Sequence, residues 1–291
     1  MLPRSPFSNA NCAKNLTTSA ESAESTERET RRLDTELVVR GLAETRTRAS
    51  RMIDAGDVQV NGRIISRPGH KVSVSSDIEV RSLKRWVARS AEKLLAACER
   101  FDINYRGRIV LDIGASTGGF TEVALARGAS RVIALDVGHG QLHPRIRGDH
   151  RVVVREGVNA RSLTGEEFAA WDVDRIDDVV VDVSFISLTL IVPSLVALLG
   201  TGFRFVFLVK PQFEVGKGNL VDGIVRDLSL RRTAALDVCR AIEATGLVIS
   251  GVAESAVDGE HGNREVIVYG DPANAANVGE WEQQLATMWE E

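Results

Sequence analysis

Residues 110–120 read VLDIGASTGGF, and this stretch decides the fold expected for the chain. An apolar strand, Val110–Ile113, runs into a loop of small residues and then into a helix that starts near Gly119. Glycines in such a loop let the backbone approach a ligand closely, and N–H groups at the start of the helix stay free to meet it. The stretch is not GxGxxG and no GK[ST] follows it, which argues against a dinucleotide site or a P-loop.

Two acids accompany this loop. Asp112 lies in the first strand, and Asp136 ends the next strand. Asp136 is placed to accept hydrogen bonds from both hydroxyls of a ribose, and Asp112 to contact an amino group directly or through water. This arrangement suits S-adenosylmethionine better than NAD; the alternative is a tight turn with two capping acids. The candidate cofactor residues here are Asp112, Gly114, Ala115, Ser116, Gly118, Gly119, Phe120 and Asp136.

Strand-like and helical stretches alternate from residue 91 onward. This alternation predicts a doubly wound α/β domain with a mainly parallel sheet. The expected strands are Ile109–Ile113, Arg131–Leu135, Arg151–Val154, Asp178–Val183, Arg204–Val209, Leu247–Val252 and Glu265–Tyr269. The expected helices are Ala91–Phe101, Gly119–Ala126, Leu188–Leu199 and Leu230–Ala244. Asn159 follows the third strand, where its amide is a candidate adenine contact or, equally well, part of an Asx-turn.

Charged residues end the two most apolar strands of this domain. Asp182 follows one of them and Lys210 follows the other. Ligands of open α/β sheets bind at the carboxyl ends of strands, so both side chains are expected beside the 114–119 loop. Only six of the 36 basic residues are Lys, and Lys can lose its proton where Arg cannot. The pair therefore suits proton abstraction, and the alternative is a structural Lys–Asp pair.

The segment before this domain has the opposite charge. Residues 31–90 carry 13 Lys and Arg against 7 Asp and Glu, a net charge of +6. Residues 91–291 carry 20 against 29, a net charge of −9, and the whole chain has −4. This asymmetry favours a polyanion-binding module joined to a larger domain, with chance clustering as the alternative.

Residues 31–80 are expected to form a small α+β unit. The expected elements are a helix through 33–42, a helix from about Thr45 to Ala55, strands Val58–Val60 and Arg63–Ile65 around an Asn61-Gly62 turn, and a final strand through 72–80. Arg46, Arg48 and Arg51 lie near the side of the second helix opposite its apolar face and are candidate phosphate contacts. Residues 1–30 are expected to form a disordered tail, and residues 81–90 a basic linker whose Trp86 packs on a neighbouring domain or stays solvated.

Several classes of protein are excluded by composition. No apolar stretch approaches the roughly 18–20 residues of a membrane span, and the first residues lack the apolar region of a secretory signal. The three cysteines are Cys12, Cys98 and Cys239. They form no CxxC pair, which excludes a disulfide scaffold and an all-cysteine zinc site and fits a reducing cytoplasm.

These motifs together resemble a known family. The strings at Asp112–Phe120, Asp182–Leu188 and Lys210–Gly216 resemble an FtsJ-type ribose methyltransferase domain. The strings at Arg32–Asp34, Gly41–Ala43, Thr45–Ala49 and Gly56–Gly62 resemble an S4 RNA-binding domain. With Asp136–Leu142, the chain resembles the TlyA/hemolysin A family of rRNA methyltransferases over residues 31–270. The resemblance implies a Rossmann-like class I methyltransferase domain at 91–291, dependent on S-adenosylmethionine, after a small S4 domain at 31–80.

The resemblance also implies an activity and a site. It implies methyl transfer from S-adenosylmethionine to a ribose 2′-hydroxyl of 16S and 23S rRNA, usually at a cytidine, with rRNA or ribosomal subunits as partners. A Lys–Asp–Lys–Glu tetrad falls on Lys93, Asp182, Lys210 and Glu265, with Glu260 competing for the last place. We expect Lys210 to act as general base, Asp182 to orient it, Lys93 to favour its neutral form by like-charge repulsion, and Glu265 to orient Lys93 or the ribose. No metal is required, because the sulfonium charge disappears during transfer.

The sequence departs from the family pattern at three places, and two other functions are alternatives to methyl transfer. Ala88–Lys93 replaces the usual SRGG-like stretch, Thr45-Arg46 replaces Ser-Arg, and the loop Gly216–Val225 matches only loosely. One rival is a non-catalytic S4-type ribosome-assembly factor. The other is a membrane-active hemolysin, because some family members are reported as hemolytic, although no stable membrane association is expected for this composition. The intact Asp112 loop together with Lys210 and Asp182 favours catalysis.

Overall fold

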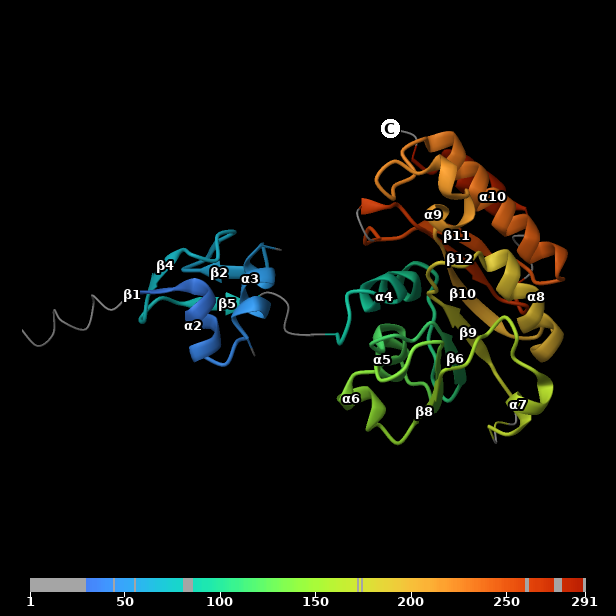
Figure 1. Ribbon diagram of the computed structural model, residues 1–291, viewed down its shortest axis with the longest axis horizontal. Coiled ribbons are helices and arrows are strands. Elements are labelled where there is room, and N and C mark those ends of the chain that lie inside the picture. The colour runs from blue at the N-terminus through green and yellow to red at the C-terminus, as the bar shows by residue number, and fades with distance from the viewer. Residues whose placement is uncertain are drawn as a thin grey trace, which may run out of the picture. The chain divides into compact units, whose positions relative to one another are not determined.

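The chain forms two compact units, Met1–Arg85 and Trp86–Glu291, here called the N-terminal and C-terminal units (Figure 1). The computed structural model describes residues 30–43, 45–54, 56–80, 86–171, 173, 175–259, 262–274 and 279–289. The predicted tail therefore lies outside the described residues except for Thr30, and the predicted linker is described only from Trp86. Within the described ranges, no helix has both the length and the apolar character needed to cross a bilayer.

The N-terminal unit packs two helices on small antiparallel sheets. Its elements are β1 (Thr30–Arg32), α2 (Leu33–Val39), α3 (Arg46–Asp54), β2 (Val58–Val60), β3 (Arg63–Ile64), β4 (Lys71–Ser73) and β5 (Ile78–Val80). The single final strand expected through 72–80 is wrong, because β4 pairs with β1 whereas β5 pairs with β2. A turn closed by the hydrogen bond from Ser76 N to Ser73 O, at 3.0 Å, separates them. Leu37, Ile53 and Val58 are fully buried between helices and strands.

The C-terminal unit is built on a seven-stranded sheet in the order β11-β12-β10-β9-β6-β7-β8. Its strands are β6 (Ile109–Ile113), β7 (Arg131–Asp136), β8 (Val152–Glu156), β9 (Asp178–Val181), β10 (Arg204–Val209), β11 (Gly251–Glu254) and β12 (Val266–Gly270). The strands from β10 to β8 are parallel, and β12 runs antiparallel to both of its neighbours. The predicted α/β class with a mainly parallel sheet is confirmed.

Five of the seven strands begin or end at a residue other than the one expected, and two of these differences concern the site and the core. The ladder of β9 ends at Val181 rather than at Val183, although Asp182 N still donates to Ile113 O at 3.0 Å. β11 begins at Gly251 rather than at Leu247. Leu247 and Ile249 are nevertheless buried, because hydrophobic alternation reports burial and not strand pairing.

Helices cover both faces of this sheet (Figure 1). They are α4 (Ala91–Arg100), α5 (Gly119–Ala126), α6 (Pro144–Arg147), α7 (Gly165–Ala169), α8 (Leu188–Leu199), α9 (Pro211–Glu214), α10 (Leu228–Ala244) and α11 (Glu280–Thr287), with a 3₁₀ turn at Lys217–Asn219. Successive strand residues point to opposite faces. Val110 and Val180 thus join the core under α4 and α5, whereas Leu111 and Val181 join the core under α8 and α10.

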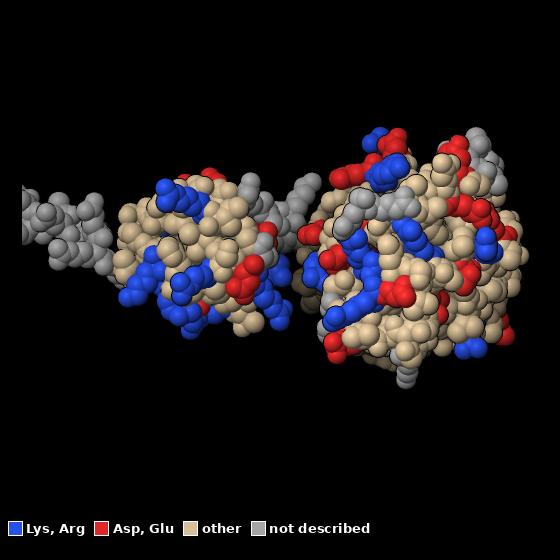
Figure 2. All heavy atoms as spheres, turned by 90° about the horizontal axis from the view of Figure 1, so that it is seen from above, with Lys and Arg blue, Asp and Glu red and all other residues tan. Residues whose placement is uncertain are grey.

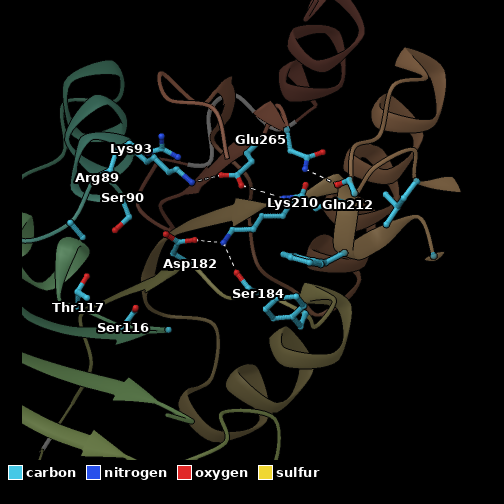
Figure 3. Close-up of a pocket in the computed structure, with 18 residues that line it drawn as sticks. Arg89, Ser90, Lys93, Ser116, Thr117, Asp182, Ser184, Lys210, Gln212 and Glu265 are labelled. Carbon is cyan, nitrogen blue, oxygen red and sulfur yellow. Dashed lines mark hydrogen bonds and ion pairs between the residues drawn. The ribbon is translucent and has the colours of Figure 1, made fainter. Parts of the chain in front are cut away.

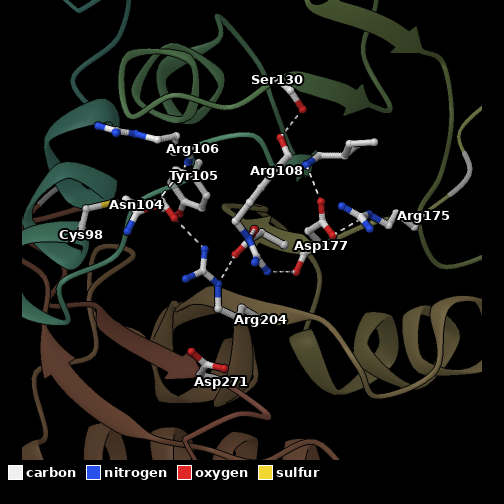
Figure 4. Close-up of polar contacts among 12 residues, drawn as sticks. Cys98, Asn104, Tyr105, Arg106, Arg108, Ser130, Arg175, Asp177, Arg204 and Asp271 are labelled. Atoms are coloured by element: carbon white, nitrogen blue, oxygen red, sulfur yellow. Dashed lines mark hydrogen bonds and ion pairs between the residues drawn. The ribbon is translucent and has the colours of Figure 1, made fainter.

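Arginines tie the starts of three strands together (Figure 4). Asp178, the first residue of β9, is buried and accepts hydrogen bonds from Arg108 Nε and, at 2.7 Å, from Arg204 Nε. Arg204 also donates to the carbonyl of Asn104 at 2.7 Å. Burial raises the pKa of Asp178, and both arginines act in the opposite direction. This cluster closes the amino edge of the sheet, on the opposite side from the strand ends that carry the predicted site.

Candidate active site

A cavity of about 910 Å³ lies at the carboxyl ends of the strands in the C-terminal unit (Figure 3). It is lined by Ala88, Arg89, Ser90, Lys93, Gly114, Ser116, Thr117, Asp182, Ser184, Phe185, Lys210, Gln212, Phe213, Gly216, Leu220, Gly223, Asn263 and Glu265. All four residues of the expected tetrad and part of the 114–119 loop therefore share one cavity. Glu260, the competitor for the fourth place, lies outside the described residues.

The first charged pair joins the ends of two neighbouring parallel strands. Lys210 Nζ lies 2.6 Å from Asp182 Oδ1, and both side chains are nearly buried. The pair meets because β9 and β10 run in register, with Phe207 opposite Val181. Lys210 Nζ also donates to Ser184 Oγ at 3.1 Å, so a carboxylate and a hydroxyl hold this nitrogen in place.

The second charged pair joins segments that are far apart in the sequence. Lys93 Nζ, from the first turn of α4, lies 2.5 Å from Oε2 of Glu265, which immediately precedes β12. Their side chains are 8% and 2% exposed, so neither is the surface charge that its sequence position alone suggests. Gln212 Nε2 lies 3.5 Å from the other oxygen of Glu265. Glu265 was expected to orient either Lys93 or the ribose, and the structure places it against Lys93.

The glycines of the loop are required by close packing. Gly114 has a φ of +83°, and a Cβ on it would lie 2.5 Å from the carbonyl oxygen of Asp182. The loop therefore rests directly on the strand end that carries the catalytic candidate. Asp136 accepts hydrogen bonds from the backbone N–H of Ser116, at 2.8 Å, and of Gly138, at 2.7 Å. These bonds fix its carboxylate at the mouth of the loop.

Three other expected cofactor residues are less accessible or already engaged. Asp112 is 0% exposed, and its Oδ2 accepts a hydrogen bond from Thr121 Oγ1 at 2.6 Å. Its Oδ1 is buried with no hydrogen-bond partner among the described residues, and burial raises its pKa to about 7. The Phe120 side chain packs in the core under α4 and α5, which leaves only its backbone at the loop. Asn159 accepts from Arg161 N at 3.0 Å, so the Asx-turn is formed.

Most other residues of the cavity were not singled out from the sequence as site residues, among them Ser184, Phe185 and Gln212. Phe185 is 86% exposed, has a φ of +65° and lies with its ring centroid 5.0 Å from that of Phe213. A bulky residue at positive φ is rare and marks a conformation that the surroundings impose. The available signal was adjacency, because these residues stand within three positions of Asp182 or Lys210.

Basic side chains gather on the surface of the N-terminal unit (Figure 2). Arg46, Arg48 and Arg51 are exposed along α3. Arg46 lies 3.2 Å from Asp34, whose side chain is 3% exposed, and Arg32 reaches the same carboxylate at 2.8 Å. Hydrogen bonds from Arg32 lower the pKa of Asp34. A buried acid thus anchors two exposed guanidinium groups, of which the sequence had indicated only Arg46.

Comparison with known proteins matches both units. The FtsJ-like methyltransferase family matches residues 86–271, and the S4 domain matches residues 31–78. The 16S/23S rRNA (cytidine-2′-O)-methyltransferase TlyA of Mycobacterium tuberculosis is 46% identical over 241 residues, which are 82% of this chain and 88% of the relative. Hemolysin A of Brachyspira hyodysenteriae is 40% identical over 82% of this chain and 98% of its own length. A solved structure from Streptococcus thermophilus, provisionally described as a hemolysin, is 35% identical with a TM-score of 0.65, and the match covers 89% of this chain and 96% of that one.

Proposed function

Because the chain belongs to the TlyA/hemolysin A family, in which an S4 domain precedes an FtsJ-like methyltransferase domain, we propose that it methylates ribosomal RNA. The reaction is transfer of a methyl group from S-adenosylmethionine to the 2′-hydroxyl of a cytidine ribose in 16S rRNA, 23S rRNA or both. The partner is rRNA or a ribosomal subunit, and the proposed location is the cytoplasm. The single observation that carries the proposal is the meeting of two Lys–acid pairs beside the glycine loop.

The first of these pairs supplies the proton chemistry. A ribose hydroxyl is a weak acid and must lose its proton as its oxygen attacks the methyl group. Lys210, in its neutral form, takes that proton on Nζ. The ammonium that forms is stabilised by Asp182, 2.6 Å away, and by Ser184 at 3.1 Å. Proton transfer thus creates a charge where the protein already holds an opposite one.

The second pair acts in positioning. Glu265 lies 2.5 Å from Lys93 Nζ and so weakens the like-charge repulsion by which Lys93 is expected to favour the neutral form of Lys210. Both groups are nearly buried, and their positions are fixed by α4 and by the start of β12. The pair gives the cavity a rigid wall of donors and acceptors, which favours one orientation of the ribose.

The residues around the glycine loop fit the cofactor. S-adenosylmethionine supplies the electrophilic methyl group. Asp136 would hold its ribose, since each carboxylate oxygen keeps a lone pair beyond the backbone bonds already made. The first N–H groups of α5, at Gly119 and Phe120, cannot pair within the helix and suit its carboxylate. The buried, unpaired Oδ1 of Asp112 keeps an acceptor directly behind the loop.

RNA would be held by the exposed arginines of the N-terminal unit and by the rim of the cavity. Arg46, Arg48 and Arg51 suit phosphate contacts, which carry affinity but little sequence information. Phe185 offers an exposed aromatic face at the cavity, and single bases bind such faces by stacking.

Removing all three arginines by substitution with Ala should lower the affinity for RNA and flatten its salt dependence by about 0.9 per lost phosphate contact. An unchanged salt slope would contradict this role.

The direct test is to map 2′-O-methyl groups on rRNA treated with the purified chain and labelled cofactor. We expect label at one or a few riboses with the wild type and none with Lys210→Ala, while calorimetry shows cofactor binding in both. Methylation by Lys210→Ala would refute the assignment of the base. No heat of cofactor binding by the wild type, with or without RNA, would favour a non-catalytic RNA-binding factor instead.

A further inference from the structure

The loop after β9 and the segment after β10, which carry the first charged pair, contact each other at three places. One loop, Asp182–Ser187, follows β9, and the other segment, Lys210–Glu214, follows β10. Asp182 meets Lys210 at the cavity, Phe185 packs against Phe213 beyond it, and Ser187 meets Glu214 at the far end. The last of these contacts involves Glu214, an acid to which the proposed chemistry gives no part.

Glu214 binds the far end of the first loop with both oxygens. Ser187 Oγ donates to Oε2 at 2.5 Å, and Leu188 N donates to Oε1 at 3.0 Å. Ser187 is the N-cap of α8 and Leu188 is its first residue. Burial raises the pKa of Glu214, whereas the two donated hydrogen bonds act in the opposite direction. The acid therefore fixes one point of the loop to a rigid helix start.

The loop between its two fixed points is under conformational strain. It leaves the ladder of β9 after Val181, and Ser184 and Phe185 are both exposed. Phe185 holds a φ of +65°, which persists only when surrounding contacts determine it. Those contacts are the Asp182–Lys210 pair on one side, the Phe213 ring against Phe185 itself, and the Glu214 bonds on the other side. We expect release of the second point to let the loop relax and to move Ser184 relative to Lys210. The backbone of Asp182 should stay in place, because its N–H donates to Ile113 O at 3.0 Å and its carbonyl packs against Gly114.

We propose that Glu214 is a positioning residue for the methyl-transfer reaction, which fixes the loop of Asp182 and Ser184 against the segment of Lys210. The inference rests on the proposed function. Glu214 is separate from the cofactor site, because its hydrogen bonds go to Ser187 and Leu188 and not to the 114–119 loop or Asp136. Its removal therefore acts on kcat and leaves cofactor binding unchanged.

The test compares Glu214→Ala, Glu214→Gln and Ser187→Ala with a matched control in the full-length chain. Gln can accept the bond from Leu188 and meet Ser187 with its amide, so it should rescue most of the activity lost in the Ala variant. The control is Glu167→Ala, because Glu167 also caps a helix, bonding Thr164 N and Thr164 Oγ1 at 2.9 Å, but lies outside the cavity. Steady-state and single-turnover methylation of rRNA, cofactor affinity and melting temperature are measured for each.

We expect kcat of Glu214→Ala to fall by about 10- to 100-fold, the range of a small misplacement of reacting groups. The cofactor Kd should stay within about twofold, Glu214→Gln should recover most of kcat, and Glu167→Ala should keep it. If Glu214→Ala does not fold, Ser187→Ala decides: reduced kcat with unchanged cofactor Kd supports the inference. Wild-type kcat in folded Glu214→Ala or Ser187→Ala, or an equal loss in Glu167→Ala, overturns it. A wild-type chain that methylates no rRNA refutes the proposed function instead.

Discussion

The two ends of β9 and β10 carry the same kind of contact with different chemistry. Where the strands start, Asp178 holds Arg204 and Arg108. Where they end, Asp182 holds Lys210. Asp178 begins β9 and Asp182 directly follows it. Of the cations, Arg204 begins β10, Lys210 directly follows it, and Arg108 directly precedes β6. The amino edge uses the cation that never loses its proton, and the carboxyl edge uses the one that can.

Under the proposed function, the Asp178 cluster has a structural role, whereas Lys210 takes part in the reaction. Two arginines on one buried carboxylate satisfy it with fixed donors and join three strands. A single Lys on Asp182 leaves room for a hydroxyl on Nζ, and it faces the cavity. The chain contains 30 Arg and only six Lys, and the proposed role as proton acceptor would account for a Lys at this position.

The largest expected effect comes from exchanging the two cations. Lys210→Arg keeps the charge opposite Asp182 but removes the group that can take a proton, so kcat should fall by about 10²- to 10⁴-fold. Arg204→Lys keeps a charge on Asp178 and should leave kcat close to that of the wild type. Single-turnover methylation measures both. An active Lys210→Arg, or an inactive but folded Arg204→Lys, would abolish the distinction between the two edges.

The second effect is on stability. Asp178→Ala leaves Arg108 and Arg204 without their buried carboxylate, which should lower the free energy of unfolding by about 3 kcal/mol. The folded variant should keep its cofactor affinity, because the cofactor loop lies at the other edge. Urea denaturation and calorimetry with S-adenosylmethionine measure the two quantities. A stable variant with weakened cofactor binding would mean that the amino edge serves the site.

The last effect concerns the Asp112 carboxyl group, which has no cation partner among the described residues. Burial raises the pKa of Asp112 to about 7, whereas an Asp in the unfolded chain titrates near 4. Between these values Asp112 binds more protons in the folded state, so its own contribution to stability should fall as pH rises, by at most about 1.4 kcal/mol per pH unit. Asp112→Asn should remove this slope, which urea denaturation between pH 4.5 and 7 would measure, and the exposed Asp237→Asn should keep it. An identical slope in Asp112→Asn would contradict the assignment.

Much of the C-terminal unit could be predicted from its sequence. Apolar runs such as Phe205–Val209 are buried on both faces, and the strand ends then place Asp182 and Lys210 at one edge. Lys93 and Glu265 could be assigned only through the family pattern. Their contact depends on β12 lying beside β10, which no local spacing records. That the four groups act together in catalysis stays a prediction.

The remaining differences arise because the partner of each segment or side chain comes from elsewhere in the chain. Val72–Val80 alternates like one strand, but hydrophobic alternation carries no information on which partner each half takes. Glu214 and Gln212 look like ordinary polar residues in the sequence, because their partners come from a different loop and a different strand. The shared anchoring of Arg32 and Arg46 similarly depends on the fold of α2 against α3.

The place of β12 in the sheet has a consequence for the order in which the protein matures. Although β12 follows β11 in the chain, it lies between β11 and β10, so the sheet stays open until it arrives. Lys93 is synthesised 172 residues before Glu265, its partner in the cavity. During synthesis from the N-terminus, the N-terminal unit can fold first, while Lys93 still lacks its partner Glu265. A nascent chain would therefore acquire affinity for RNA well before it acquires a complete cavity.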